Sequence, residues 1–106
     1  MFKFFQNFLK PIKVERELVL DQTTEGVSKP FKINLKHSDF NEVSVLVEGL
    51  IHPDSVLVQV SNNGKSWYNV GTDIRTNGWH EYPIIANWVR VYKVGSFGRV
   101  KVTLVG

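Results

Sequence analysis

Short runs of alternating apolar and polar residues, separated by turn signals, limit what this chain can fold into more than any other feature. Phe31, Ile33 and Leu35 are apolar, for example, and the residues between them are polar. This period of two is typical of a β-strand with one buried face. After residue 13 no segment has a convincing helical period. We predict short strands over residues 14–21, 31–35, 43–48, 56–61, 67–70, 79–85, 88–94 and 100–105.

Turn signals divide these runs from one another. Asn63-Gly64 and Asn77-Gly78 are Asn-Gly pairs, which favour tight hairpin turns because both residue types tolerate positive φ. Residues 22–29 are polar and contain a glycine, so we expect a loop there. Pro83 lies inside the predicted strand 79–85, which indicates a sheet edge or a bulge because proline has no N–H for a ladder.

Many short strands with turn-rich connections predict an all-β fold, and we expect an antiparallel, jelly-roll-like β-sandwich of about eight short strands. The length of 106 residues is enough for one hydrophobic core and too short for two. We therefore expect two parts, an N-terminal arm over residues 1–13 and a sandwich domain over residues 14–106.

The sequence contains none of the usual patterns of catalytic residues. The chain has no cysteine, and His37, His52 and His80 lack the spacing of a local metal site. We predict a protein that is not an enzyme and uses no metal or other cofactor. Turn chemistry accounts for four aspartates at strand ends or turns, which are Asp21, Asp39, Asp54 and Asp73.

The net charge of +3 lies in the arm. Its three lysines are the only charged residues among the first thirteen, and the ten basic and ten acidic residues of the remainder balance. A formally neutral body does not predict nucleic-acid binding. No apolar run approaches the ~20 residues that span a bilayer, and the N-terminus lacks the pattern of a signal peptide. We therefore expect a protein that does not pass through the secretory route.

The arm combines apolar and basic residues, and the sandwich does not need it. As a helix it would place Phe2, Phe5 and Leu9 on one side, and it is too short to be stable alone in water. Three partners are open: its own domain, another protein subunit, or an anionic membrane surface, which we consider unlikely. The residues predicted to contact the partner are Phe2, Lys3, Phe4, Phe5, Phe8, Leu9 and Lys10.

Aromatic residues supply the second candidate surface. Trp79, His80 and Tyr82 follow a predicted turn, and we expect them to form an exposed aromatic patch that could stack on a sugar or fill a partner's pocket. Trp67 and Trp88 are expected in the core or over the end of the sandwich.

Two segments carry a resemblance to known proteins. Ser61-Asn62-Asn63-Gly64-Lys65-Ser66-Trp67 resembles a hairpin found in discoidin-like carbohydrate-binding sandwiches and in small phage structural proteins, where it is structural. The layout from Asn77-Gly78 through Trp88-Val89-Arg90-Val91 to the closing strand 100–105 resembles that of small β-sandwich proteins of tailed phages. Many of those proteins decorate or cement the capsid, and others belong to tails.

The resemblance implies a non-enzymatic structural protein of a virus particle. We expect a phage capsid cement or decoration protein that bridges major capsid subunits, present as a homo-oligomer or in many copies. It would be assembled in the host cytoplasm and lie on the capsid surface. Two alternatives stay open: a carbohydrate-binding module used in host recognition, and a tail or baseplate subunit.

Overall fold

The computed structural model describes residues 16–33, 41–84 and 86–105, and within them every element is a β-strand. The predicted arm, together with His37 and Asp39, lies outside the described residues. The all-β prediction is confirmed. The nine strands are β1 (Arg16–Gln22), β2 (Gly26–Val27), β3 (Phe31–Lys32), β4 (Asn41–Glu48), β5 (Ser55–Ser61), β6 (Tyr68–Ile74), β7 (Gly78–Ile84), β8 (Trp88–Val94) and β9 (Val100–Val105).

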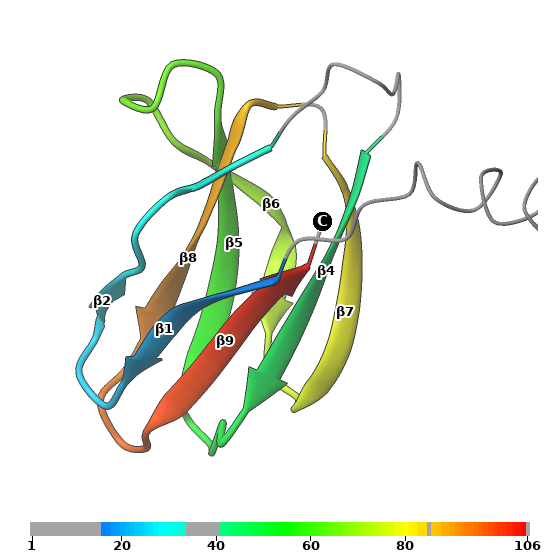
Figure 1. Cartoon of the computed structure of the whole chain (residues 1–106). Coiled ribbons are helices and arrows are strands. Elements are labelled where there is room, and N and C mark those ends of the chain that lie inside the picture. Colours follow the sequence, from blue (N-terminus) through cyan, green and yellow to red (C-terminus); the bar gives the residue numbers. More distant parts are fainter. Residues whose placement is uncertain (1–15, 34–40, 85, 106) are drawn as a thin grey trace, which may run out of the picture.

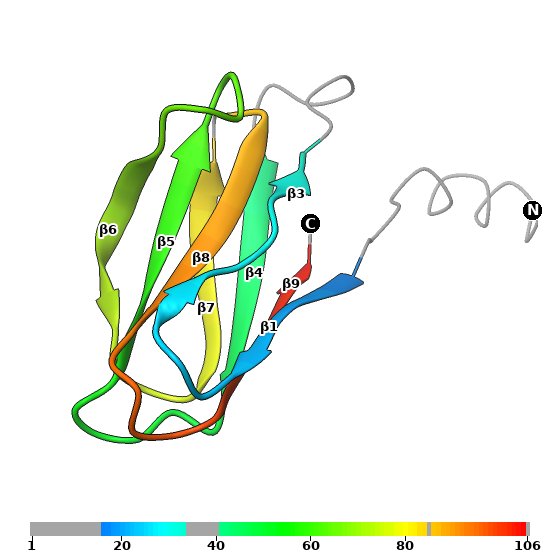
Figure 2. The same cartoon turned by 90° about the vertical axis from the view of Figure 1, so that its left-hand side faces the viewer.

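The strands form two packed antiparallel sheets (Figures 1 and 2). One sheet has the order β1-β9-β4-β7. The other has the order β2-β8-β5-β6, and β3 also pairs with β8. Apart from β2–β3 and the β5–β6 hairpin, every pair of consecutive strands belongs to different sheets, and this winding is the jelly roll. The expected jelly-roll-like sandwich is confirmed.

Alternation within the strands builds the core. Val43, Val45 and Val47 of β4 are fully buried, and they face Val89 and Val91 of β8 from the opposite sheet. The side chains between them point outward, because successive residues of a strand alternate between its two faces. The core is rich in valine, whose branched side chain packs well on a pleated surface.

Two predicted boundaries need correction. The polar segment predicted as a loop contains β2, because Gly26 and Val27 pair with Lys93 and Tyr92 of β8. The return strand of the hairpin begins at Tyr68 and continues to Ile74, four residues past its predicted end. A register shift opposite β5, between Val56 and Val58, lets β6 continue through Gly71.

The β5–β6 hairpin is confirmed, and side chains rather than backbone pairs close its turn. The Asn63 Oδ1 atom accepts hydrogen bonds from the backbone N–H groups of Lys65 (2.8 Å) and Ser66 (2.9 Å). The Ser61 hydroxyl accepts one from the Gly64 N–H at 2.8 Å, where Gly64 has a φ of +75°. Asn63 and Gly64 thus lie in the turn as predicted, but Gly64 alone of the pair has a positive φ. Residues 62–67 connect the two strands, so the turn is wider than the tight hairpin that an Asn-Gly pair favours.

The edge position of β7 is also confirmed. β7 pairs with β4 alone, and Pro83 lies opposite Glu42. The loops β1–β2, β4–β5, β6–β7 and β8–β9 gather at one end of the sandwich, which we call the loop end. The β5–β6 turn and the β7–β8 connection lie at the other end (Figure 1).

Candidate interaction surfaces

The structure does not bring Trp79, His80 and Tyr82 together. Strand β7 alternates, so Trp79 lies on the outer face of its sheet and is 57% exposed. His80 and Tyr82 lie on the inner side, opposite Val45 and Val43 of β4. Tyr82 packs against the core, and the His80 Nε2 atom hydrogen-bonds the Thr76 carbonyl at 2.9 Å. The expected aromatic patch is therefore divided between two faces.

Trp79 instead belongs to a row of residues that crosses the outer face of the four-stranded sheet. The register places Leu18 of β1 opposite Thr103 of β9, Thr103 opposite Leu46 of β4, and Leu46 opposite Trp79 of β7. Leu18 is 53% exposed and Leu46 is partly exposed. We call these four residues the outer row. An exposed row of this kind is a candidate protein-binding surface.

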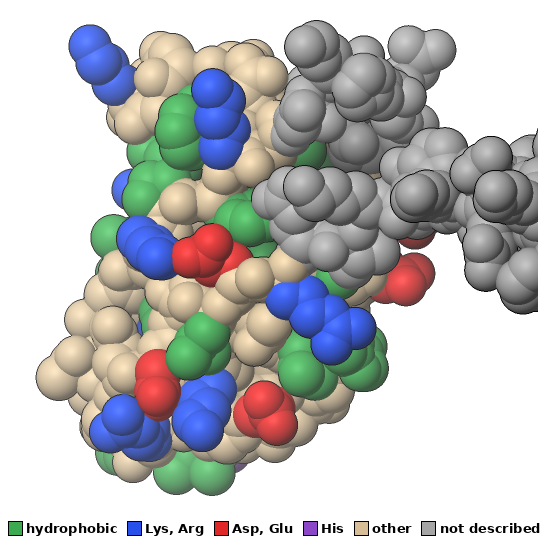
Figure 3. Space-filling model, in the orientation of Figure 1, with side chains coloured by type: hydrophobic (Ala, Val, Ile, Leu, Met, Phe, Trp, Pro, Cys, Tyr) green, Lys and Arg blue, Asp and Glu red, His purple; other side chains and the backbone are tan. Residues whose placement is uncertain are grey.

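Charged residues flank the outer row, and they are not evenly distributed. Glu42, Glu48 and Glu81 lie at outward positions of β4 and β7, and all three are exposed. Arg16 of β1 is exposed at the other side of the sheet, and Lys101 of β9 is exposed between Asp21 of β1 and Glu48 of β4 in the register. Figure 3 views the molecule from this side and shows hydrophobic side chains among charges of both signs.

The outer face of the second sheet carries the other two tryptophans. The Arg90 guanidinium lies 4.3 Å from the centre of the Trp67 ring and donates a hydrogen bond to the Gln59 amide oxygen at 2.8 Å. The Lys32 ammonium lies 5.6 Å from the Trp88 ring. Both rings are half-buried and neither belongs to the core, so the core alternative of the prediction is wrong. Trp88 lies beside Gly64 of the β5–β6 turn, near the end of the sandwich. A cation covers each ring, so the pair forms polar-aromatic surface rather than packed interior.

A buried ion pair holds the loop end together. The Lys93 and Asp54 side chains are both 0% exposed, and their charged atoms lie 3.0 Å apart. The Lys93 ammonium also donates hydrogen bonds to the carbonyls of Thr23 (2.8 Å) and Gly95 (2.6 Å), so all three of its protons are used. Lys93 thereby connects loops β1–β2, β4–β5 and β8–β9.

The Asp54 carboxylate orients the β8–β9 loop. Its Oδ2 atom accepts hydrogen bonds from the N–H groups of Phe97 (3.0 Å) and Gly98 (2.9 Å). Burial raises the pKa of Asp54, but the bonds from Gly98, Lys93 and Phe97 outweigh burial and hold that pKa below its usual value. Above this network the side chains of Phe97 (69% exposed) and Ile51 (49% exposed) reach solvent. The loop end therefore offers apolar side chains on a hydrogen-bonded base.

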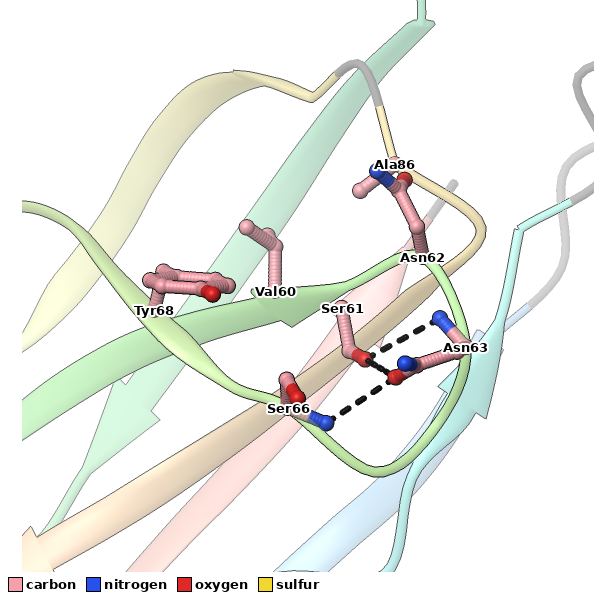
Figure 4. Close-up of a pocket in the computed structure, with 7 residues that line it drawn as sticks. All are labelled: Val60, Ser61, Asn62, Asn63, Ser66, Tyr68 and Ala86. Carbon is pink, nitrogen blue, oxygen red and sulfur yellow. Dashed lines mark hydrogen bonds between the residues drawn. The ribbon is translucent and has the colours of Figure 1, made fainter.

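A hollow of about 310 Å³ lies at the opposite end, where the β5–β6 turn approaches the β7–β8 connection (Figure 4). Val60 and the exposed Tyr68 form one side, and Ala86 faces them from the other strand connection. Its polar residues Ser61 and Asn63 bond one another and the turn backbone. These groups are committed to the turn, whereas Asn62, Ser66 and Tyr68 also line the hollow.

Within residues 16–33, 41–84 and 86–105 no three histidine or acidic side chains gather as a metal site would require. His52 is exposed in the β4–β5 loop, far along the chain from His80 on β7. In the same described residues, no helix is long and apolar enough to cross a membrane.

Some features of these surfaces can be predicted from the sequence, and others cannot. The alternation of each strand is readable, but the outer row depends on which strands are neighbours. Lys93 continues the alternation of Val89 and Val91, so the period of two by itself places this lysine on the inner face of its strand. Its partner Asp54 is 39 residues away, and no local pattern connects the two.

Comparison with known proteins gives one likeness, and it concerns the fold. No protein-family profile and no curated protein sequence matches the chain. The crystal structure of the SPBc2 prophage-derived protein YomS superposes with a TM-score of 0.67 at 15% sequence identity. The match covers 89% of this chain and 94% of that one. The chain thus shares its sandwich fold, over nearly its whole length, with a protein of prophage origin.

Proposed function

We propose that this protein is a non-enzymatic structural protein of a phage particle, and specifically a cement protein that bridges major capsid subunits. The observation that best supports this proposal is the likeness of its whole fold to a prophage-derived protein. Jelly rolls are common among viral capsid domains, which agrees with this origin.

Separated apolar sites support the bridging role. Trp79 and Leu18 are exposed on the outer face of one sheet, and Phe97 and Ile51 are exposed at the loop end. A protein that strengthens a shell must contact more than one subunit, and modest contacts repeated over many copies give strong attachment. The ordered loop end suits such a role because little freedom is lost when it binds.

Binding to phage heads tests the proposal. Heads from a phage that lacks this gene would be mixed with the purified full chain and sedimented. We expect saturable binding at a fixed ratio to the major capsid protein, and heads that open at a higher temperature. Phe97→Ser should weaken the binding, whereas Lys65→Ser, in the exposed β5–β6 turn, should not. Heads that neither bind the chain nor gain stability would contradict the cement role, and binding to tails alone would indicate a tail subunit.

A carbohydrate-binding module is the second candidate, and the Trp67 cluster favours it. Trp67, Arg90, Gln59 and Asn69 lie together on the second sheet, where Gln59 donates from its amide nitrogen to the Asn69 oxygen at 3.0 Å. Aromatic rings beside amides are suited to sugars. A glycan array with the full chain separates the two candidates. A carbohydrate-binding module should bind a glycan and lose that binding in Trp67→Ala, whereas a cement protein should show no glycan binding that depends on Trp67.

A further inference from the structure

We propose that the outer row is the docking surface for the N-terminal segment, residues 2–10, of a second copy of this chain. Copies of the protein would thereby be linked, arm to sheet. The proposal rests on the proposed function only in requiring several copies side by side, and purified protein alone tests it.

The acidic side of the outer face is the first argument. Glu48 and Glu81 lie two residues along their strands from Leu46 and Trp79, and Glu42 lies four residues from Leu46 on the same outer face. None of the three forms an ion pair with a described residue, whereas Asp21 and Glu17 of β1 are paired with Arg99 and Lys29 at 2.7 Å. Glu48 lies opposite Lys101 of β9, whereas Glu42 and Glu81 have no cation opposite them in the register of the described strands. The β4–β7 side therefore presents apolar surface beside the negative charge of these two glutamates.

The segment before β1 has the complementary composition. Residues 1–13 contain three lysines and no acidic residue, along with the phenylalanines and leucine of the predicted apolar stripe. Apolar side chains would cover Leu46 and Trp79, and the lysines would meet the glutamates. Opposite charges around an apolar contact set its register and orientation.

Dimensions agree with this fit. Neighbouring strands lie about 4.8 Å apart, so the outer row extends for about 14 Å from β1 to β7. As a helix, nine residues of the arm would be about 14 Å long at 1.5 Å per residue. One arm therefore has the length needed to cover one outer row.

Charge also decides between a chain's own arm and that of another copy. The arm leads into β1, the edge opposite β7. Docked on its own sheet, its C-terminal lysines, Lys10 and Lys13, would be held near Arg16 of β1, which carries like charge. The arm of a second copy has no such tether and can place its lysines beside the glutamates. We therefore assign the outer row to a second copy.

Complementation between two full-length variants tests the proposal by light scattering. Trp79→Ser removes the docking surface, and Phe5→Ser with Leu9→Ser removes the apolar stripe of the arm. We expect the unmodified chain to associate as its concentration rises, and each variant to weaken association about tenfold or more, since a buried tryptophan is often a hot spot. An equimolar mixture should form 1:1 dimers, because one variant keeps the arm and the other keeps the surface.

A matched control and two outcomes complete the design. Phe97→Ser removes an aromatic side chain of similar exposure at the loop end and should leave association unchanged. Salt at about 1 M should weaken association by screening the lysines from the glutamates. A chain that stays monomeric, or two variants that fail to restore association when mixed, would overturn the proposal. Failure of head binding would leave this result intact, so the two proposals fail separately.

Discussion

Lys93 occupies a position on β8 where the alternation calls for a core residue. It shares the inner face with Val89 and Val91, and like them it is fully buried. A buried charge is tolerated when every donor has a partner, and the ammonium has three. At the scale of single residues, the loop end depends on this one side chain.

Replacing Lys93 by methionine should lower the free energy of unfolding by about 3–5 kcal/mol, because the Asp54 carboxylate would remain buried without its cation. Urea unfolding followed by fluorescence measures the change. Lys29→Met is the matched control, since it breaks the exposed pair with Glu17 and should cost at most about 1 kcal/mol. Equal losses for the two variants would show that the buried network is unimportant for stability.

Alanine substitutions at two glycines distinguish the cost of backbone strain from the cost of a steric clash. Gly95 (φ +92°) and Gly78 (φ +113°) both adopt a conformation that other residues rarely take. A Cβ at Gly78 would meet no atom within 4 Å, but at Gly95 it would overlap the Asp54 carboxylate. We expect Gly78→Ala to cost about 1–2 kcal/mol from strain. Gly95→Ala should cost about 1–3 kcal/mol more, from overpacking against Asp54. A smaller loss at Gly95 than at Gly78, in thermal or urea unfolding, would contradict this account.

At the scale of elements, a side chain substitutes for strand pairing between two loops. The Asn77 Oδ1 atom accepts a hydrogen bond from the Leu50 N–H at 2.7 Å, and its Nδ2 atom donates one to the Leu50 carbonyl at 3.1 Å. Leu50 itself is buried. The β6–β7 turn thereby holds the β4–β5 loop in place, a role that Asn-Gly turn chemistry does not reveal.

Asn77→Ala should therefore destabilise the protein by about 1–3 kcal/mol, since the Leu50 N–H and carbonyl would both lose their partner. Asn77→Asp keeps the acceptor and loses the donor, so its free energy of unfolding should fall between those of the unmodified protein and Asn77→Ala. Asn69→Ala is the control because its bond to Gln59 is exposed, and its effect should stay within about 0.5 kcal/mol. If Asn69→Ala were as damaging as Asn77→Ala in urea unfolding, the bridge would not be the cause.

At the scale of the whole molecule, hydrogen-bonded carboxylates connect stability to pH. The Arg99 guanidinium lowers the pKa of Asp21 by a hydrogen bond, and the Gly95 N–H followed by the Tyr92 hydroxyl lowers the pKa of Glu25. The pKa of Asp54 is also below its usual value. Each of these groups binds its proton less readily in the folded state than in the unfolded chain.

A depressed folded pKa contributes stability that is present above the unfolded pKa and is lost as the pH falls through the folded pKa. The unfolded values are 3.8 for Asp21 and Asp54 and 4.5 for Glu25. We expect the urea midpoint to be nearly constant from pH 7 to about pH 5 and to fall steadily below that. Glu25→Gln should make the fall shallower, and Glu48→Gln, an exposed residue on β4, should serve as its control. A midpoint that rises on acidification would refute the assignment.

Alternation and turn residues were enough to predict most elements of this protein. The runs at residues 43–48, 56–61 and 88–94 became β4, β5 and β8 with boundaries shifted by two residues or fewer. β2 was missed because two residues carry no period, and its pairing with β8 depends on a distant strand. The core alternative for Trp67 and Trp88 was wrong for a related reason. Aromatic residues suggest burial, but Arg90 and Lys32 stabilise these rings on an outer face.

The amino-acid sequence by itself determined the fold class and the hairpin at Asn63-Gly64, and it limited Pro83 to a sheet edge or a bulge, because each follows from interactions among near neighbours in the chain. Tertiary structure alone decided which strands lie side by side. It joined Lys93 to Asp54, set Leu18, Leu46 and Trp79 in one row, and separated Trp79 from Tyr82. The physical reason is that local propensity and periodicity act over a few residues, whereas a surface is assembled from strands that only the packed core brings together.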